Sequence, residues 1–149
     1  MKLIRWTGMV AVVCLIAVSG LAQGAPDKAY LQKIWDGWST MQVENVDPYY
    51  AAGAHVFFDD EPLKFNSWSE YRKTAAKEAE EYKSWKFTLN DDVEIHAAGA
   101  NYWGMATLNS VTVNKDGKEE KSTLRWTFVL EKQKGRWVLV HEHVSAPVG

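Results

Sequence analysis

Polar residues interrupt an apolar segment near the C-terminus, in RWVLVHEHVS (136–145). Side chains alternate along a strand, so His141 and His143 share one face and Glu142 lies on the other. Histidine titrates near neutral pH, which suits proton transfer or ligand binding. The segment therefore predicts a reaction centre, a binding site or a hydrogen-bonded polar strand end, and these alternatives stay open.

Arg125 is the second candidate, because it stands between Leu124 and Trp126 in another apolar segment. A buried arginine needs a partner, and its planar guanidinium suits a carboxylate. In one interpretation, Arg125 binds an acidic group on a ligand. The alternative is an internal salt bridge, for which the candidates are Glu142, Asp59 and Asp60.

A tight turn determines how these two segments face each other. KQKG (132–135) fits a three-residue hairpin loop with Gly135 in the left-handed region, so we expect Lys132 to pair with Arg136. The same register predicts the pairs Val129–Leu139, Thr127–His141 and Arg125–His143. One face would then begin apolar and end polar, as a pocket wall does.

Aromatic and acidic residues extend this candidate site. Trp38 and Trp103 are suited to line the apolar part of a pocket. Asp59 and Asp60 could supply a general base if burial raised their pKa values. The favoured interpretation of these aspartates is a turn leading into Pro62.

Neither a metal nor an organic cofactor is predicted. The i, i+2 spacing of His141 and His143 could hold a metal, but the spacing of His55 and His96 does not point to a common site. The sequence also contains no serine or cysteine nucleophile motif, phosphate loop or dinucleotide-binding motif.

Three helices, one of them short, are predicted before the long strands. The first has apolar residues at helical spacing, namely Leu31, Ile34, Trp35, Trp38 and Met41. A short helix follows from Asp47 and Pro48 to Gly53, and then a short strand over 54–60. SWSE (67–70) is a capping box, and the third helix follows it. The stripe of that helix consists of Trp68, Tyr71, Ala75, Ala79 and Tyr82.

The second half of the chain predicts four long strands, over 86–98, 101–113, 121–132 and 136–145. Helices followed by an antiparallel meander indicate an α+β fold, with the helices on one face of a curved sheet. The last two strands are apolar on both faces, and such a sheet is covered on both sides. We therefore expect a homodimer formed through the sheet.

The N-terminus has the pattern of a secretory signal peptide. Lys2 and Arg5 precede an apolar segment, Met9–Val18, and small residues follow. We expect cleavage between Ala22 and Ala25, which gives a signal peptide over 1–25 and one domain over 26–149. The protein would be periplasmic or secreted, with no membrane anchor after cleavage.

The composition narrows the classes of partner. Cys14 is the only cysteine, so the mature chain cannot form disulfides. Loss of the two N-terminal cations leaves a formal net charge of −4, which argues against a nucleic-acid partner. Seven of the eight tryptophans lie in the mature chain. Their large side chains are expected to fill the core or to line a pocket.

The order of these elements resembles the nuclear transport factor 2-like superfamily, a cone-shaped α+β fold also called cystatin-like. The ending RWTFVLEKQKGRWVLVHEHVSAPV (125–148) is most similar to the SnoaL-like branch and to the association domain of calcium/calmodulin-dependent protein kinase II. Its features are Arg125, Gly135, Trp137 and the VHEH segment. The resemblance implies a pocket between sheet and helices, and usually a dimer through the sheets.

Steroid isomerases of this superfamily use an aspartate base on the first strand, with tyrosine and carboxylic acid donors. Aligning YAAGAHVFFDD from Tyr50 places Phe58 at the position of the base. Asp59 follows one residue later and would point to the opposite face. This departure, and the lack of matching donors, counts against steroid isomerisation.

Three functions follow. The first is an exported, cofactor-free protein that binds a small organic molecule, with an acid as one option, through Arg125, His141, His143 and Trp38 or Trp103. The second is an isomerase, cyclase or dehydratase that uses the same pocket, with Asp59 or His143 moving a proton. The third is an oligomerisation module without a ligand.

Overall fold

The protein was analysed as a computed structural model, which describes residues 24–59 and 62–147. The predicted signal peptide lies almost entirely outside these residues. The helices are α1 (Lys28–Ser39) and α2 (Trp68–Ala79), with short 3₁₀ turns η1 (Val43–Asn45) and η2 (Asp47–Tyr49). The strands are β1 (Phe57–Phe58), β2 (Tyr82–Leu89), β3 (Glu94–Ala98), β4 (Asn101–Asn114), β5 (Glu119–Gln133) and β6 (Arg136–Ser145). No helix among the described residues is long and apolar enough to cross a membrane.

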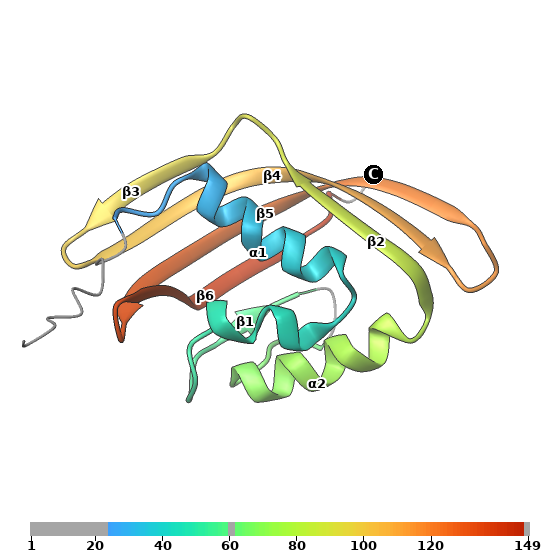
Figure 1. The fold of residues 1–149 in the computed structure, drawn as a ribbon, viewed down its shortest axis with the longest axis horizontal. Helices are drawn as coiled ribbons and strands as arrows, with labels where there is room; N and C mark the ends of the chain where they lie inside the picture. Colours follow the sequence, from blue (N-terminus) through green and yellow to red (C-terminus); the bar gives the residue numbers. More distant parts are fainter. Residues whose placement is uncertain (1–23, 60–61, 148–149) are drawn as a thin grey trace, which may run out of the picture.

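The strands form one curved sheet, and the helices lie on its concave side (Figure 1). The order along the sheet is β1-β6-β5-β4-β2, and β3 also pairs with β4. β1 runs parallel to β6, whereas the other strand pairs are antiparallel. The predicted α+β class and curved sheet are confirmed.

Both helices begin at capping residues that the sequence shows. The Asp27 carboxylate accepts a hydrogen bond from Tyr30 N–H at 2.7 Å, and Ser67 Oγ accepts one from Glu70 N–H at 3.2 Å. The capping box predicted that the Glu70 carboxylate accepts from Ser67 N–H. It accepts from Asn66 N–H instead. Each helix buries the part of its predicted stripe that lies within it. The last predicted member of each stripe is only partly buried, because Met41 follows the end of α1 and Tyr82 begins β2.

The segment after α1 is less helical than predicted. Helical structure from Asp47 ends at Tyr49, and Tyr50 is already extended. Tyr50 forms a parallel bridge with Leu139, and Ala51 N–H donates to the Leu139 carbonyl. The prediction of a short helix up to Gly53 was wrong, because strand-like pairing with β6 replaces helical hydrogen bonds.

The predicted strand over 86–98 is divided into β2 and β3, which pair with successive parts of β4. Between them, Asn90 N–H donates to the Thr107 carbonyl. Asp92 accepts from both Thr107 N–H and Thr107 Oγ1–H, at 3.0 and 2.7 Å. These polar contacts hold the break against β4.

The β5–β6 register also differs from the prediction. Gln133 pairs with Arg136, and both intervening residues, Lys134 and Gly135, have positive φ angles of 50° and 82°. The loop is therefore a two-residue turn of the kind that hairpins favour. A bulge between the pairs Leu130–Leu139 and Val129–His141 then shifts the register again.

The two shifts change the facing pairs and move Trp137 and Leu139 to the inner face. The observed pairs are Val129–His141, Thr127–His143 and Arg125–Ser145. Arg125 and the histidines still share a face, because a two-residue offset preserves alternation. Leu139, predicted on that face, is instead fully buried in the core.

Candidate functional site

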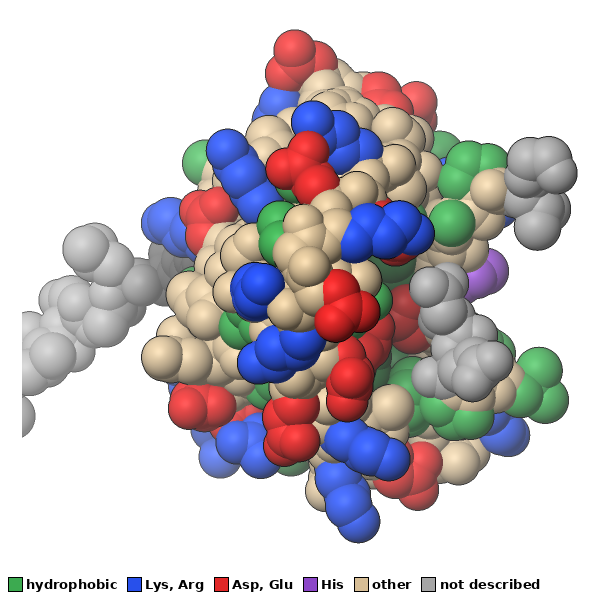
Figure 2. Space-filling view, turned by 90° about the vertical axis from the view of Figure 1, so that its right-hand side faces the viewer, with side chains coloured by type: hydrophobic (Ala, Val, Ile, Leu, Met, Phe, Trp, Pro, Cys, Tyr) green, Lys and Arg blue, Asp and Glu red, His purple; other side chains and the backbone are tan. Residues whose placement is uncertain are grey.

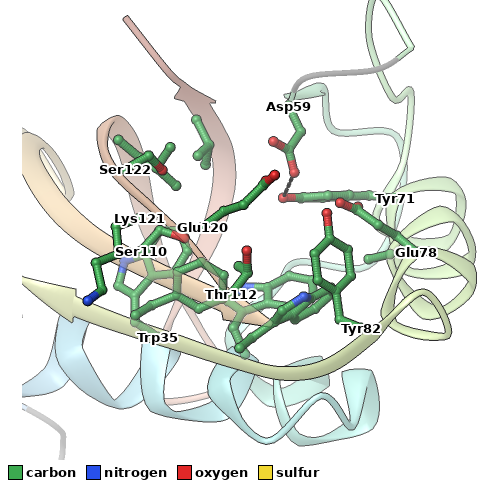
Figure 3. A pocket seen from close by; sticks show the side chains of 16 residues that line it. Trp35, Asp59, Tyr71, Glu78, Tyr82, Ser110, Thr112, Glu120, Lys121 and Ser122 are labelled. Carbon is green, nitrogen blue, oxygen red and sulfur yellow. Dashed lines mark hydrogen bonds between the residues drawn. The ribbon is translucent and has the colours of Figure 1, made fainter. Parts of the chain in front are cut away.

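A pocket of about 500 Å³ lies between the helices and the concave face of the sheet (Figure 3). Helix α1 contributes two tryptophans, and α2 contributes Tyr71, Ala75 and Glu78. The side chains of β2, β4 and β5 complete the walls. The aromatic lining residues are Trp35, Trp38, Tyr71, Tyr82, Trp85 and Phe87.

The mouth of the pocket is more polar than its interior. Figure 3 shows Asp59, Glu78 and Glu120 around one opening, together with the hydroxyl groups of Tyr71 and Tyr82. In the view from the end of the molecule, acidic side chains gather around a hollow (Figure 2). A second pocket of about 360 Å³ adjoins the first and shares Asp59, Tyr71 and Glu78.

Asp59 points into the pocket because it follows β1, where Phe57 is buried in the core. Phe58 points the other way and contacts His141 and His143 on the outer face, with ring centroids 5.7 Å apart in both pairs. The alignment that placed Phe58 at the base position therefore assigned the wrong residue to the pocket side. Asp59, expected to face away, is the acid that lines the pocket.

Tyr71 donates a hydrogen bond from its hydroxyl to Asp59 Oδ2 at 2.8 Å (Figure 3). Burial, followed by the charge of Asp59, raises the pKa of Tyr71 well above its ordinary value of 10.0. Tyr71 thus stays a neutral donor near pH 7. The pair places a carboxylate acceptor and a phenol donor on one side of the pocket.

A second acid–phenol pair lies deeper, in a closed network around Glu142. Its carboxylate accepts from the Tyr50 hydroxyl at 2.6 Å and from Trp126 Nε1–H at 2.8 Å. The Tyr50 hydroxyl in turn accepts from Trp38 Nε1–H at 3.0 Å. Trp38 also lines the pocket, so its indole connects this network to the pocket wall.

Glu142 is only 1 % exposed, and Ser110 is the other buried polar or charged residue among the described residues. Burial raises the pKa of the Glu142 carboxyl from 4.5 to about 7, although the hydrogen bonds from Tyr50 and Trp126 lower it. From the sequence, Arg125 was the one partner proposed for this acid. Its true partners come from a loop and from the neighbouring strand.

The other predicted site residues lie on the outer face of the sheet. Arg125 is exposed, and its guanidinium donates to the Ala146 carbonyl at 3.0 Å. His143 is exposed, and His141 Nδ1 lies 2.7 Å from the Val56 carbonyl oxygen. None of the three lines the pocket, because Glu142 takes the inward position on β6.

Trp38 and Trp103 have different positions. Trp38 lines the pocket, as hypothesised. Trp103 lies on the outer face, where it is 41 % exposed and stacks on His96 with ring centroids 4.5 Å apart. Within the described residues, no group of three or more histidine, cysteine or acidic side chains is arranged to hold a metal ion.

The pocket wall that sequence reasoning missed carries hydroxyl groups. Ser110 and Ser122 are paired across β4 and β5, and Thr112 lies next to them on the concave face. Their positions follow the same alternation as Leu108 and Leu124. The signal was therefore present as serine and threonine at inward positions of two long strands.

Residues 28–149 match the model of the SnoaL-like domain family. The chain belongs to this family. A search of curated proteins found no significant match.

Solved structures with the same fold share little sequence with this SnoaL-like domain. A nuclear transport factor 2-like protein from Salmonella enterica has 16 % identity and a TM-score of 0.73, covering 80 % of this chain and 87 % of its own. The association domain of the Caenorhabditis elegans calcium/calmodulin-dependent kinase II has 18 % identity and a TM-score of 0.63, with 79 % and 91 % covered. A candidate dehydratase from Streptomyces avermitilis has 14 % identity and a TM-score of 0.70, with 80 % and 92 % covered.

Proposed function

We propose that this SnoaL-like domain binds a small, largely apolar organic molecule in the pocket between α1, α2 and the sheet. The observation that carries the proposal is the aromatic lining of a cavity of about 500 Å³, a volume within the range of small-molecule sites. Six aromatic side chains line this cavity and offer rings and apolar edges for a small molecule to pack against. Export to the periplasm or the cell exterior remains part of this proposal.

The pocket does not favour the acidic ligand that the sequence suggested. Arg125 and both C-terminal histidines are on the other side of the sheet. The pocket lining carries three carboxylates, on Asp59, Glu78 and Glu120, and one lysine. A ligand acid would meet like charges at the mouth, so the uncharged part of the ligand supplies the binding energy.

The test is to block the pocket without disturbing the core. Ser122→Phe places a ring into the pocket from an exposed wall position, whereas Thr123→Phe places it on the outer face. Binding of 3-tert-butylphenol, followed by tryptophan fluorescence, should be lost in the first variant and retained in the second. Equal binding to both variants would place the ligand elsewhere and refute the proposal.

Native mass spectrometry of the protein purified from its own host identifies the natural ligand class. A retained small molecule that Ser122→Phe loses and Thr123→Phe keeps would support the pocket. A molecule retained by both variants would contradict it. The same spectra report the oligomeric state.

A second function, proton transfer on the bound molecule, is supported by the Asp59–Tyr71 pair. Asp59 would take a proton from the ligand, and Tyr71 would donate a hydrogen bond to the charge that develops. Such chemistry needs no cofactor and would suit an isomerase, cyclase or dehydratase. Asp59→Asn should then abolish turnover of the natural ligand while ligand binding persists; unchanged turnover would exclude Asp59 as the base.

We also propose a homodimer that uses the outer face of the sheet. Trp103 and Met105 are 41 % and 40 % exposed there. Half-buried Val129 pairs with Trp103, and half-buried Phe58 lies on the same face at the edge strand β1. A second copy would cover these apolar side chains. This assembly is independent of the pocket, which opens on the other side of the sheet.

A further inference from the structure

The indole N–H of Trp35 has no hydrogen-bond acceptor. Trp35 is 4 % exposed, and among the described residues its Nε1 is the one fully buried side-chain nitrogen or oxygen atom without a hydrogen-bond partner. Buried tryptophans usually donate this N–H. Four others in this chain donate it to oxygen atoms at 2.6–3.0 Å, namely Trp38, Trp68, Trp126 and Trp137. An unpaired buried donor costs about 1–3 kcal/mol, so the exception at Trp35 requires a reason.

Trp35 lies in the wall of the pocket. Figure 3 shows it at the end of the pocket away from Asp59 and Glu78. Its closest aromatic neighbours are Phe87 and Trp126, with ring centroids 5.3 and 5.1 Å from its own. Aromatic rings are only weak acceptors. A molecule bound in the pocket is therefore the available source of an oxygen acceptor for this N–H.

The surrounding contacts hold the indole in this position. On one side of Trp35 along α1, Gln32 Oε1 accepts from Leu89 N–H at 2.8 Å. On the other side, Ser39 Oγ accepts from Phe87 N–H at 3.0 Å and donates to the Trp35 carbonyl at 2.8 Å. These bonds fix α1 against β2, and the rings packed on the indole keep its N–H inside the molecule, away from water.

The neighbouring groups favour an uncharged acceptor. Lys121 is the one cation among the described residues that line this pocket, and its ammonium group lies 2.8 Å from Glu119 Oε1. An anionic ligand would compete with that carboxylate, and one indole N–H would not replace its hydration. A carbonyl oxygen needs less compensation. The hydroxyls of Ser110 and Ser122, on the same side of the pocket, can donate to its second lone pair.

We infer that the pocket selects an uncharged carbonyl compound, whose oxygen accepts a hydrogen bond from Trp35 Nε1–H while its apolar body packs against the aromatic lining. The ligand then supplies the acceptor that the buried N–H lacks. This inference rests on the proposed binding function and specifies its ligand class.

Two compounds of nearly equal shape test the role of the carbonyl group. 2-Acetylnaphthalene carries a C=O group where 2-isopropenylnaphthalene carries C=CH₂. The ketone loses more hydration than the alkene on entering any apolar site, so a direct comparison of their affinities is not sufficient. The informative quantity is the ratio of the two dissociation constants, compared between the wild type and a variant that lacks the N–H. Equilibrium dialysis measures both constants.

Replacement of Trp35 by 3-benzothienylalanine puts a sulfur atom in place of the N–H and keeps the bicyclic ring. This change should weaken the ketone about tenfold relative to the alkene, because only the ketone loses a hydrogen bond. The same replacement at Trp103 is the matched control. Trp103 lies on the outer face and does not line the pocket, so the ratio should stay as in the wild type.

Nuclear magnetic resonance observes the hydrogen bond in the wild-type protein itself. The Trp35 indole N–H can be assigned through its proximity to the Phe87 ring. Its proton resonance should move further downfield with the ketone than with the alkene, because both naphthalenes shift it by their ring currents but only the ketone accepts from it. This measurement does not depend on the folding of any variant.

The outcomes separate the two proposals. An unchanged ratio in the Trp35 variant, or the same indole shift with both compounds, overturns the carbonyl inference while pocket binding stands. A change of ratio in the Trp103 control as large as in the Trp35 variant also overturns it, because the effect would then not come from the pocket. Failure of both naphthalenes and of 3-tert-butylphenol to bind the wild type would refute the proposed binding function as well.

Discussion

Neighbouring residues of β6 lie in opposite environments on the two faces of the sheet. Glu142 points inward and is almost completely buried, with Tyr50 and Trp126 as hydrogen-bond donors. His141 and His143 point outward, next to Phe58. The most conspicuous polar motif of the sequence is thus divided between a sealed network and an open surface, and neither part lines the pocket.

Residue type alone therefore does not indicate which face of the sheet carries the pocket. Histidine and arginine are the usual candidates for chemistry, and here they lie on the outer face with backbone carbonyls as partners. The pocket is instead built from aromatic rings, hydroxyls and carboxylates. The predictions below test this division, beginning with the largest expected effect.

Glu142→Ala should destabilise the protein most. It leaves the buried Tyr50 hydroxyl and the Trp126 indole N–H without an acceptor, and we expect a loss of about 3 kcal/mol. Urea unfolding measures it, with His143→Ala on the outer face as the control. A loss in Glu142→Ala no greater than in the control would show that the inner network contributes little.

The stability should also depend on pH through Glu142. The folded-state pKa is about 7 and the ordinary value is 4.5, so the folded state holds the proton more tightly. Stability from this group is therefore fully present below about pH 4.5, falls by about 1.4 kcal/mol per pH unit up to about pH 7, and then levels off. The difference between wild type and Glu142→Gln, measured by urea unfolding from pH 4 to 8, isolates it.

A pH-independent difference between these two proteins would exclude a raised pKa for Glu142. The outer histidines provide the contrast, since His143→Ala should leave the slope between pH 4.5 and 7 intact.

Trp103→Glu should weaken the proposed homodimer. A charge in place of a tryptophan that is 41 % exposed on the outer face should cost about 2 kcal/mol, or roughly 30-fold in the dimer dissociation constant. Sedimentation equilibrium measures it. Ser84→Glu, which adds the same charge at the edge strand β2, is the control and should have little effect.

If the wild-type protein is monomeric at all accessible concentrations, the proposal that the outer face is a dimer interface is refuted. Pocket binding in Trp103→Glu should be unchanged in either case.

The smallest effect should come from the residues that first attracted attention. Arg125→Ala and His143→Ala should change the affinity for 3-tert-butylphenol less than twofold, because both side chains lie across the sheet from the pocket. Fluorescence titration measures it. A tenfold loss in either variant would show that the outer face communicates with the pocket, and the division of the two faces would fail.

Local patterns predicted much of the fold. The apolar spacing from Leu31 to Trp38 predicted α1, and Ser67 marked the start of α2, because both signals depend on residues a few positions apart. The α+β class followed from the order of elements. The errors in the β5–β6 register were also local in origin. Lys134 adopts a positive φ of 50°, which is uncommon outside glycine, and a bulge follows in β6.

The candidate site was less predictable, because its parts meet only through long-range pairing. Trp38 was identified from its helical stripe, and Asp59 was named as a possible base, yet its side of the sheet was assigned incorrectly. One residue of offset at the end of β1 reverses which side chain enters the pocket. Ser110 was not identified, since a serine within a strand carries no signal until its burial is known.

The sequence by itself determined the family, the α+β class, the first residue of each helix cap and the buried stripe of α1, because these depend on short-range spacing and capping chemistry. Tertiary structure alone decided which polar residues face the ligand space. The parallel pairing of β1 with β6, the bulge in β6 and the packing of α2 bring Asp59, Glu78 and Glu120 together and direct Arg125 outward. The physical reason is alternation along a strand: a shift of one residue exchanges inside for outside, and that shift is fixed by contacts between segments far apart in the chain.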